Sequence, residues 1–132
     1  MGATEAVHAS GTTLSVTVSR VIDPLVGSGA ALVPGTRAVG VVVRIANRGP
    51  GIYDSSATGD ISIVPSSGTA TPAFASHGVC QTPLRDFDNY ITAGEVRHGC
   101  VAFAVSRSAT VHAVLFSPHG QATGRTAWLT RG

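Results

Sequence analysis

The chain has 132 residues, of which 43% are hydrophobic and only 12% are charged, and its formal net charge is +2 at pH 7. This length suits one domain, and the composition is too apolar and too weakly charged for a disordered chain. All nine basic residues are arginines, and they form no run in the sequence. We therefore do not expect a nucleic-acid-binding protein, which usually clusters its basic residues on one face.

Two segments show the alternation of apolar and polar residues that is typical of β-strands. Over residues 12–22, Leu14, Val16 and Val18 alternate with Ser and Thr, and the phase then shifts at residues 20–22, which predicts a β-bulge. Residues 36–46 are the strongest strand candidate, because four β-branched residues share one face and Val42 lies on the other. We expect this second strand to be covered on both sides.

Shorter strands are predicted further along the chain, separated by clusters of Gly, Pro, Asn and Ser. They cover residues 52–53, 60–64, 73–77, 95–105, 110–116 and 126–130. Seven to nine short antiparallel strands with such turns predict an all-β, immunoglobulin-like sandwich. We place this single domain at residues 12–130, after a flexible N-terminal segment over residues 1–11.

Several short motifs of this layout resemble a known family. They are Asp23-Pro24, Asn47-Arg48-Gly49, Ala93-Gly94-Glu95, the GCVAFAV strand at 99–105, Phe116-Ser117-Pro118 and a terminal Trp128. Together they resemble an uncharacterised family of immunoglobulin-like domains from lipoproteins and secreted proteins of Gram-positive, actinobacterial organisms. The fold is also similar to that of the mycobacterial immunoprotective extracellular antigens. The resemblance implies export, a two-sheet sandwich and attachment to the cell envelope, without an established activity.

The two cysteines, Cys80 and Cys100, have 19 residues between them. In an exported domain, two cysteines most simply form one disulfide. Closing a loop of this size contributes about 3 kcal/mol of stability in the chain-entropy model. We therefore predict a Cys80–Cys100 disulfide.

A zinc site is the alternative for the same cysteines. His77 and Cys80 form a His-x-x-Cys pair, and His98 and Cys100 form a His-x-Cys pair whose side chains share one face of a strand. Two thiolates and two imidazoles are a tetrahedral zinc set, although the spacing is not that of a zinc finger. We expect no metal or other cofactor, and this site stays open as the second interpretation.

The long loop over residues 81–94 is the candidate binding loop. It holds Arg85, Phe87 and Tyr90, and aromatic residues beside charges in a loop are typical of contact surfaces. The same loop contains Asp86, Asp88 and Asn89, whose oxygens suit calcium but serve more often to cap turns.

Motifs for catalysis are missing from the sequence. There is no Gly-x-Ser-x-Gly and no glycine-rich phosphate loop. No stretch approaches the ~20 apolar residues of a membrane span, and no signal peptide is visible. We expect a non-enzymatic, extracellular or cell-surface interaction module for an unknown protein or envelope ligand. Its signal or lipid anchor would lie outside this sequence.

Overall fold

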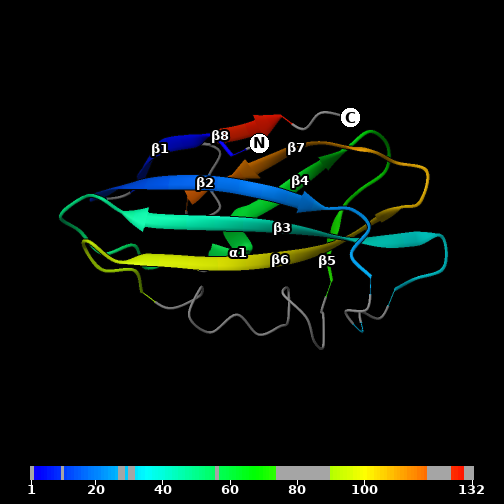
Figure 1. The fold of residues 1–132 in the computed structure, drawn as a ribbon, viewed down its shortest axis with the longest axis horizontal. Coiled ribbons are helices and arrows are strands. Elements are labelled where there is room, and N and C mark those ends of the chain that lie inside the picture. The colour runs from blue at the N-terminus through cyan, green and yellow to red at the C-terminus, as the bar shows by residue number, and fades with distance from the viewer. Residues whose placement is uncertain are drawn as a thin grey trace.

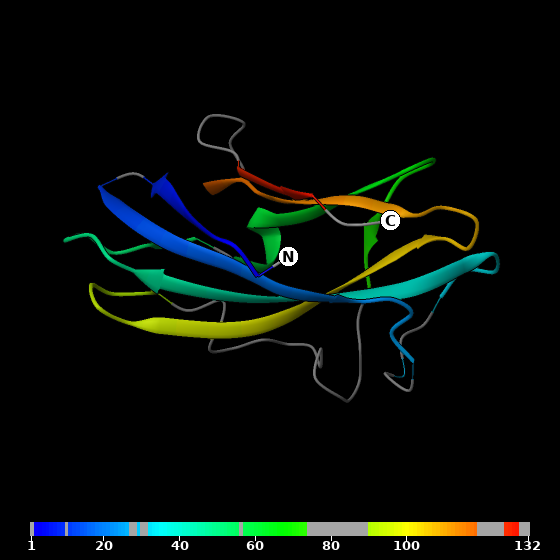
Figure 2. The ribbon, with the colours of Figure 1, turned by 45° about the horizontal axis from the view of Figure 1, so that its top comes forward.

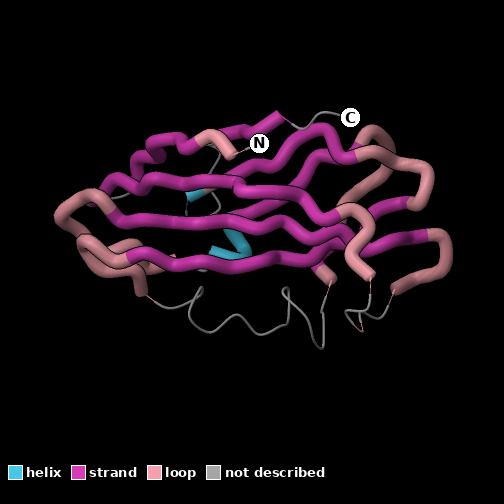
Figure 3. The backbone as a smooth tube through the Cα atoms, viewed as in Figure 1, coloured by secondary structure: helices cyan, strands magenta, loops and turns pink. Residues whose placement is uncertain are grey.

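The computed structural model describes residues 2–9, 11–26, 29, 32–55, 57–73, 90–118 and 126–129. These residues form an all-β sandwich of two antiparallel sheets, as the sequence predicted, with one short helical turn, α1 (Ala57–Asp60) (Figure 1, Figure 3). The strands described are β1 (Thr4–Ala9), β2 (Thr12–Ile22), β3 (Thr36–Asn47), β4 (Ile61–Pro65), β5 (Thr71–Pro72), β6 (Val96–Ser106), β7 (Val111–Phe116) and β8 (Thr126–Leu129).

The two sheets lie face to face as separate layers (Figure 2). The larger sheet has the strand order β1-β2-β3-β6-β5, and the smaller sheet has the order β4-β7-β8. The chain crosses from the larger to the smaller sheet between β3 and β4, and again between β6 and β7. Each end of β3 is joined to a loop, and these two loops lie at opposite ends of the sandwich.

The core lies between the sheets and follows from the alternation seen in the sequence. Side chains at every second position of a strand point to the same face, and on β3 these are Val39, Val41, Val43 and Ile45, all fully buried. Tyr53 and Phe116 are the largest fully buried side chains, with ring centroids 6.2 Å apart. The core is thus built from β-branched residues around a pair of aromatic rings.

The predicted β-bulge is present in β2. Val18 pairs with Val43 and Arg20 pairs with Val42, so one extra residue, Ser19, is inserted into β2. The insertion changes which residues of β2 face the core after this point. Val21, opposite Val41, is the next residue packed against the core.

The sheet begins earlier than the sequence indicated. Thr4–Ala9 lies within residues 1–11, where we predicted a flexible segment, yet it pairs with β2 along its whole length. Only Val7 of this strand is buried, so the sequence carries little of the apolar alternation that identifies a strand. Trp128 joins the same region to the smaller sheet, because its Nε1 donates to the carbonyl of Ala3 at 3.0 Å.

The face of the larger sheet that is turned away from the smaller sheet is called the outer face below. Val42 of β3 lies on this face opposite Cys100 of β6. Cys100 and Ala102 are buried there, with Ile22 and Leu25 packed against them. The apolar residues of β3 are therefore buried on the core side, and Val42 on the outer face is half-buried.

Candidate interaction surface

Asn47, the last residue of β3, organises the loops at one end of the sandwich. Its side chain is fully buried, and its Oδ1 accepts hydrogen bonds from the Thr12 hydroxyl at 2.6 Å and the Gly49 backbone N–H at 3.2 Å. Its Nδ2 donates to the carbonyls of Gly51 at 2.9 Å and Ile91 at 2.7 Å. One side chain thus ties together the β1–β2 turn, the loop after β3 and the segment before β6. We call this group of loops the Asn47 end.

The backbone of Asn47 adds two further links. Its N–H donates to the carbonyl of Glu95 at 2.9 Å, and its carbonyl accepts from the N–H of Gly94 at 2.8 Å. Every polar group of this residue therefore has a partner, which removes the cost of burying an amide. The loops of the Asn47 end are consequently held in fixed positions.

Two glycines permit the close packing of these loops. A Cβ added to Gly49 would lie 2.5 Å from the backbone N of Thr13, and one added to Gly51 would lie 3.0 Å from the carbonyl carbon of Gly11. No side chain fits at these positions without moving backbone atoms. The β1–β2 turn and the loop after β3 therefore pack backbone against backbone.

Two large apolar side chains point outward from this rigid support. Tyr53 and Ile91 form an antiparallel bridge with backbone hydrogen bonds of 2.9 and 3.1 Å, and both side chains are fully buried. Because side chains alternate along extended backbone, the preceding residues, Ile52 and Tyr90, point away from the core. They are 55% and 67% exposed. As diagonal neighbours across the bridge, they lie roughly 7–8 Å apart, within reach of long side chains.

A polar network fixes the backbone on which Tyr90 is mounted. Arg97 donates through Nη2 to the carbonyl of Tyr90 at 3.3 Å and through Nη1 to Glu95 at 3.1 Å. Glu95 also accepts from the backbone N–H of Thr92 at 2.9 Å and from the Thr92 hydroxyl. These hydrogen bonds from Thr92, followed by that from Arg97, lower the pKa of Glu95 to about 2. The carboxylate is therefore held ionised.

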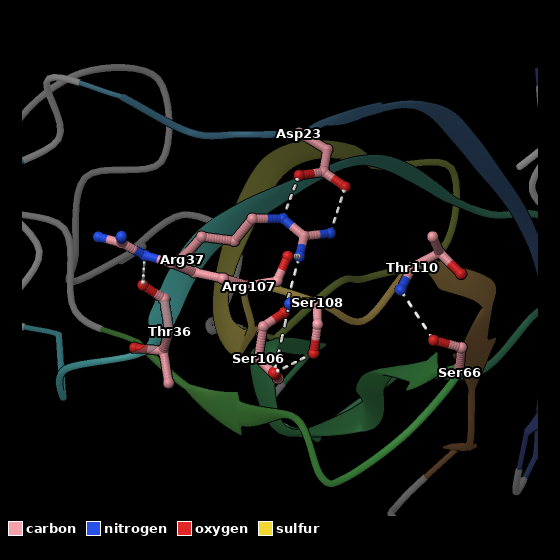
Figure 4. Close-up of polar contacts among 8 residues, drawn as sticks. All are labelled: Asp23, Thr36, Arg37, Ser66, Ser106, Arg107, Ser108 and Thr110. Atoms are coloured by element: carbon pink, nitrogen blue, oxygen red, sulfur yellow. Dashed lines mark hydrogen bonds and ion pairs between the residues drawn. The ribbon is translucent and has the colours of Figure 1, made fainter.

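The opposite end of the sandwich is fastened by Arg37, near the start of β3 (Figure 4). Its guanidinium holds both carboxylate oxygens of Asp23, with Nε–Oδ1 at 2.7 Å and Nη2–Oδ2 at 2.9 Å. Its Nη1 donates to the carbonyl of Ser106 at 2.7 Å and to that of Arg107 at 3.2 Å. The hydrogen bonds and charge of Asp23 raise the pKa of Arg37, against the opposing effect of desolvation.

The contacts of Arg37 join the end of β2, the start of β3 and the β6–β7 turn. A second contact at the same end joins Ser66, after β4, to the N–H of Thr110 at 2.9 Å (Figure 4). The guanidinium of Arg37 donates its hydrogen bonds to groups of its own chain. We therefore interpret this end as structural and the Asn47 end as the candidate surface for contacts.

The structure places three of the residues that the sequence singled out. Tyr90 is exposed at the Asn47 end. His98 and Cys100 lie on the outer face of β6, His98 exposed and Cys100 buried, opposite Arg44 and Val42. The other predicted residues lie outside the described part of the chain: His77, Cys80, Arg85, Asp86, Phe87, Asp88 and Asn89. The predicted disulfide and the calcium interpretation of the loop therefore stay untested.

The zinc interpretation gains no support from the described residues. Among them, no group of three or more His, Cys, Asp or Glu side chains could hold a metal ion.

Sequence reasoning missed both central residues of the Asn47 end. The sequence predicts Asn47 only as part of a turn and Ile52 only as part of a short strand. The Asn47-Arg48-Gly49-Pro50-Gly51 cluster did indicate a turn. The contacts of Asn47 with Thr12 and Ile91 join positions 35 and 44 residues away, which no local pattern reveals.

Comparison with known proteins gives a fold neighbour. No protein-family model matches the chain, and no curated protein matches it. Among solved structures, the chain is similar to a Bacillus subtilis protein, ycdA, whose crystal structure is described as that of "a putative lipoprotein". The TM-score is 0.70 at 14% sequence identity, and the match covers 97% of this chain but 39% of the Bacillus chain. The similarity establishes a shared fold over nearly the whole chain, which spans less than half of that protein's length.

No helix within the described residues is long and apolar enough to cross a membrane.

Proposed function

We propose that this chain is a non-catalytic, immunoglobulin-like module of a cell-envelope or secreted protein, which contacts a partner through the Asn47 end. The fold similarity to the Bacillus protein carries the proposal, because this chain matches 39% of a longer protein described as "a putative lipoprotein". That relationship is expected of a module used within larger envelope proteins. The absence of catalytic motifs from the sequence supports a role in binding rather than catalysis.

The Asn47 end has the features of a contact surface. Tyr90 and Ile52 offer a large exposed apolar area, and Arg48 is exposed on the adjoining loop. Tyr and Arg are enriched among the residues that dominate protein interfaces. Because the loops are already fixed by Asn47, binding would cost little additional ordering of the backbone. Tyr90 belongs to the predicted binding loop over residues 81–94, in which Arg85 and Phe87 stay predicted contact residues.

Photo-cross-linking in the native host tests this surface. The full-length protein would carry a photoreactive residue at position 52 or 90, and at position 64 as a control, since Val64 lies exposed on β4. We expect cross-linked adducts of a defined mass from positions 52 and 90. We also expect protease added to intact cells to digest the cross-linked protein. Adducts from position 64 alone, or a protein confined to the cytosol, would contradict the proposal.

The Cys80–Cys100 disulfide belongs to the same proposal, because it requires an oxidising compartment. Intact mass after alkylation under denaturing, non-reducing conditions tests it, together with a metal assay on the native protein. We expect no alkylation and no bound metal. Two alkylated cysteines would refute the disulfide, and stoichiometric zinc alongside them would make metal binding the better interpretation.

A further inference from the structure

The outer face of the larger sheet carries a row of polar and basic side chains at its centre. Arg44 of β3 lies on this face, because its neighbours Val43 and Ile45 are buried in the core. The register places Thr17 of β2 on one side of Arg44 and His98 of β6 on the other. Adjacent strands are roughly 4.7–4.9 Å apart, so these three side chains form a continuous row across the sheet.

The β-bulge in β2 adds a second guanidinium to this row. Without the extra residue, Arg20 would follow Val18 on the face that is buried in the core. With the insertion, Arg20 pairs with Val42, which lies on the outer face. Arg20 is exposed there as a diagonal neighbour of Arg44. The bulge thus brings two arginines together on one face, and we call Arg20, Arg44, His98 and Thr17 the basic row.

The side chains of Arg20, Arg44 and His98 lack partners among the described residues. Arg37 and Arg97 each form an ion pair, with Asp23 and Glu95. No side-chain hydrogen bond or ion pair joins Arg20, Arg44 or His98 to another described residue, although Arg44 is half-buried. Two neighbouring arginines repel each other when no anion lies between them. Their arrangement therefore favours an anion supplied from elsewhere.

The described acidic residues lie away from the basic row. Asp23 and Glu95 are engaged in their ion pairs, and Asp60 is buried with its carboxylate accepting from the Tyr53 hydroxyl. Glu5 is opposite Val16, on the core-facing side of β1, and Asp54 belongs to the loop after β3. Among the described residues, positive charge is thus concentrated on this part of the outer face.

An apolar strip adjoins the basic row. Val42 and Cys100 are the next outward residues after Arg44 and His98 along β3 and β6. Ile22 and Leu25 are only partly buried where they pack on this strip. A partner that covered the row would therefore also meet apolar side chains, which a small inorganic anion would leave uncovered.

From this juxtaposition we propose that the outer face binds an acidic segment of a partner protein. Arg20 and Arg44 engage carboxylates of that segment, since the planar guanidinium matches a carboxylate through two parallel hydrogen bonds. His98 adds a hydrogen bond at one end of the row, and the Thr17 hydroxyl, which shares a hydrogen bond of 2.7 Å with Thr4, lies at the other end. Apolar side chains of the segment pack against Val42, Ile22 and Leu25. This surface is distinct from the Asn47 end, so either proposal can fail without the other.

Binding of a labelled synthetic peptide that alternates Glu with Leu, measured by fluorescence anisotropy, tests the inference. We expect Arg20→Glu and Arg44→Glu each to weaken binding by about tenfold, and rising salt to weaken binding to the wild type. Arg107→Glu is the control, because Arg107 is also an exposed arginine and lies in the β6–β7 turn, outside the basic row. It should leave affinity within about twofold. Melting temperatures of the three variants establish that each is folded.

Further peptides and competitors separate the possible sources of the anion. A Gln-Leu peptide should fail to bind, and a Glu-Ser peptide should bind more weakly than the Glu-Leu peptide. The proposal would be overturned if the folded Arg20→Glu and Arg44→Glu variants bound the Glu-Leu peptide with the same affinity as the wild type. So would displacement of that peptide by inorganic phosphate at equal concentration, or stronger binding to vesicles of anionic lipid than to the peptide. Either of those results would assign the row to phosphate chemistry.

Discussion

The hydroxyl of Thr12 donates to Oδ1 of Asn47 at 2.6 Å, across 35 positions of the sequence. Both side chains are buried, one at the start of β2 and the other at the end of β3. The contact fixes the β1–β2 turn against the loop that carries Ile52. Stability of the fold and order of the candidate surface therefore depend on the same hydrogen bonds.

Asn47→Ala is expected to destabilise the domain by about 3 kcal/mol. The variant removes two donated and two accepted hydrogen bonds and leaves the buried hydroxyl of Thr12 without its Oδ1 acceptor. An unsatisfied buried polar group costs about 1–3 kcal/mol, and each lost hydrogen bond about 1 kcal/mol, with partial relaxation. Urea unfolding followed by circular dichroism measures the change.

Thr4→Ala is the control for Asn47→Ala, because it removes a hydrogen bond of 2.7 Å to Thr17 that is exposed to solvent. Its effect should stay within about 0.5 kcal/mol. An Asn47→Ala variant as stable as Thr4→Ala would mean that water replaces the amide, and that Asn47 does not organise the loops.

Gly49→Ala tests whether these loops are packed backbone against backbone. The added methyl would lie 2.5 Å from the backbone N of Thr13, so the turn must move. Forcing an extra carbon into a packed site costs about 1–3 kcal/mol. Gly68→Ala is the comparison, since Gly68 has φ +69° but nothing within 4 Å of an added Cβ. It should cost about 1 kcal/mol through backbone conformation alone.

Changes in the NMR amide shifts of the two glycine variants separate their effects. Gly49→Ala should perturb residues 11–13 and 90–92, whereas Gly68→Ala should perturb only its own turn. If the changed amide shifts in Gly49→Ala were confined to residues 48–50, the loops would not be closely packed against each other.

The strands could be predicted from the sequence because burial on one face leaves a local signature. The strand over residues 12–22 was predicted with the bounds that the structure shows, since Leu14, Val16 and Val18 all enter the core. The strand β1 left no such signature, because Val7 is its only buried residue. Its place in the sheet comes from backbone pairing with β2, which side-chain identity does not encode.

The candidate surfaces could be predicted only in part. Tyr90 was noticed because an aromatic residue in a polar loop is unusual, and it is exposed as the contact hypothesis requires. The sequence does not identify Ile52 as an exposed contact residue, because a short apolar pair is equally typical of a buried strand. The sequence does not reveal the basic row either. Its residues Arg20, Arg44 and His98 belong to three strands, and only the register and the bulge bring them together.

The ion pair of Arg37 with Asp23 should be measurable as a coupling energy of about 1 kcal/mol in a double-mutant cycle with Arg37→Met and Asp23→Asn. The value is modest because the two side chains remain 19% and 30% exposed. Arg37→Met alone should cost about 2 kcal/mol, because it also releases the carbonyls of Ser106 and Arg107. High salt should reduce the coupling. A coupling of zero, with a full effect of Arg37→Met, would assign the role of Arg37 to the carbonyls alone.

Glu95 should make the stability of the domain depend on pH in the acidic range. Its pKa in the folded protein is lowered to about 2 from an ordinary value of 4.5, by the hydrogen bonds of Thr92 and then of Arg97. A lowered carboxyl pKa stabilises the folded state fully above the unfolded value, and this contribution is lost as pH falls towards the folded value. The Glu95 contribution should therefore be complete above pH 4.5, decline between 4.5 and about 2, and vanish below that range.

Melting temperatures of the wild type and Glu95→Gln across this range measure the contribution directly. The difference between the two proteins should be constant above pH 4.5 and should shrink steadily towards pH 2. Glu5→Gln, which removes an exposed carboxylate from β1, serves as the control for a simple change in net charge. If both variants show the same pH profile, the hydrogen bonds of Thr92 and Arg97 do not distinguish Glu95 from a solvated carboxylate. The network beneath Tyr90 would then be too loose to hold that side chain in place.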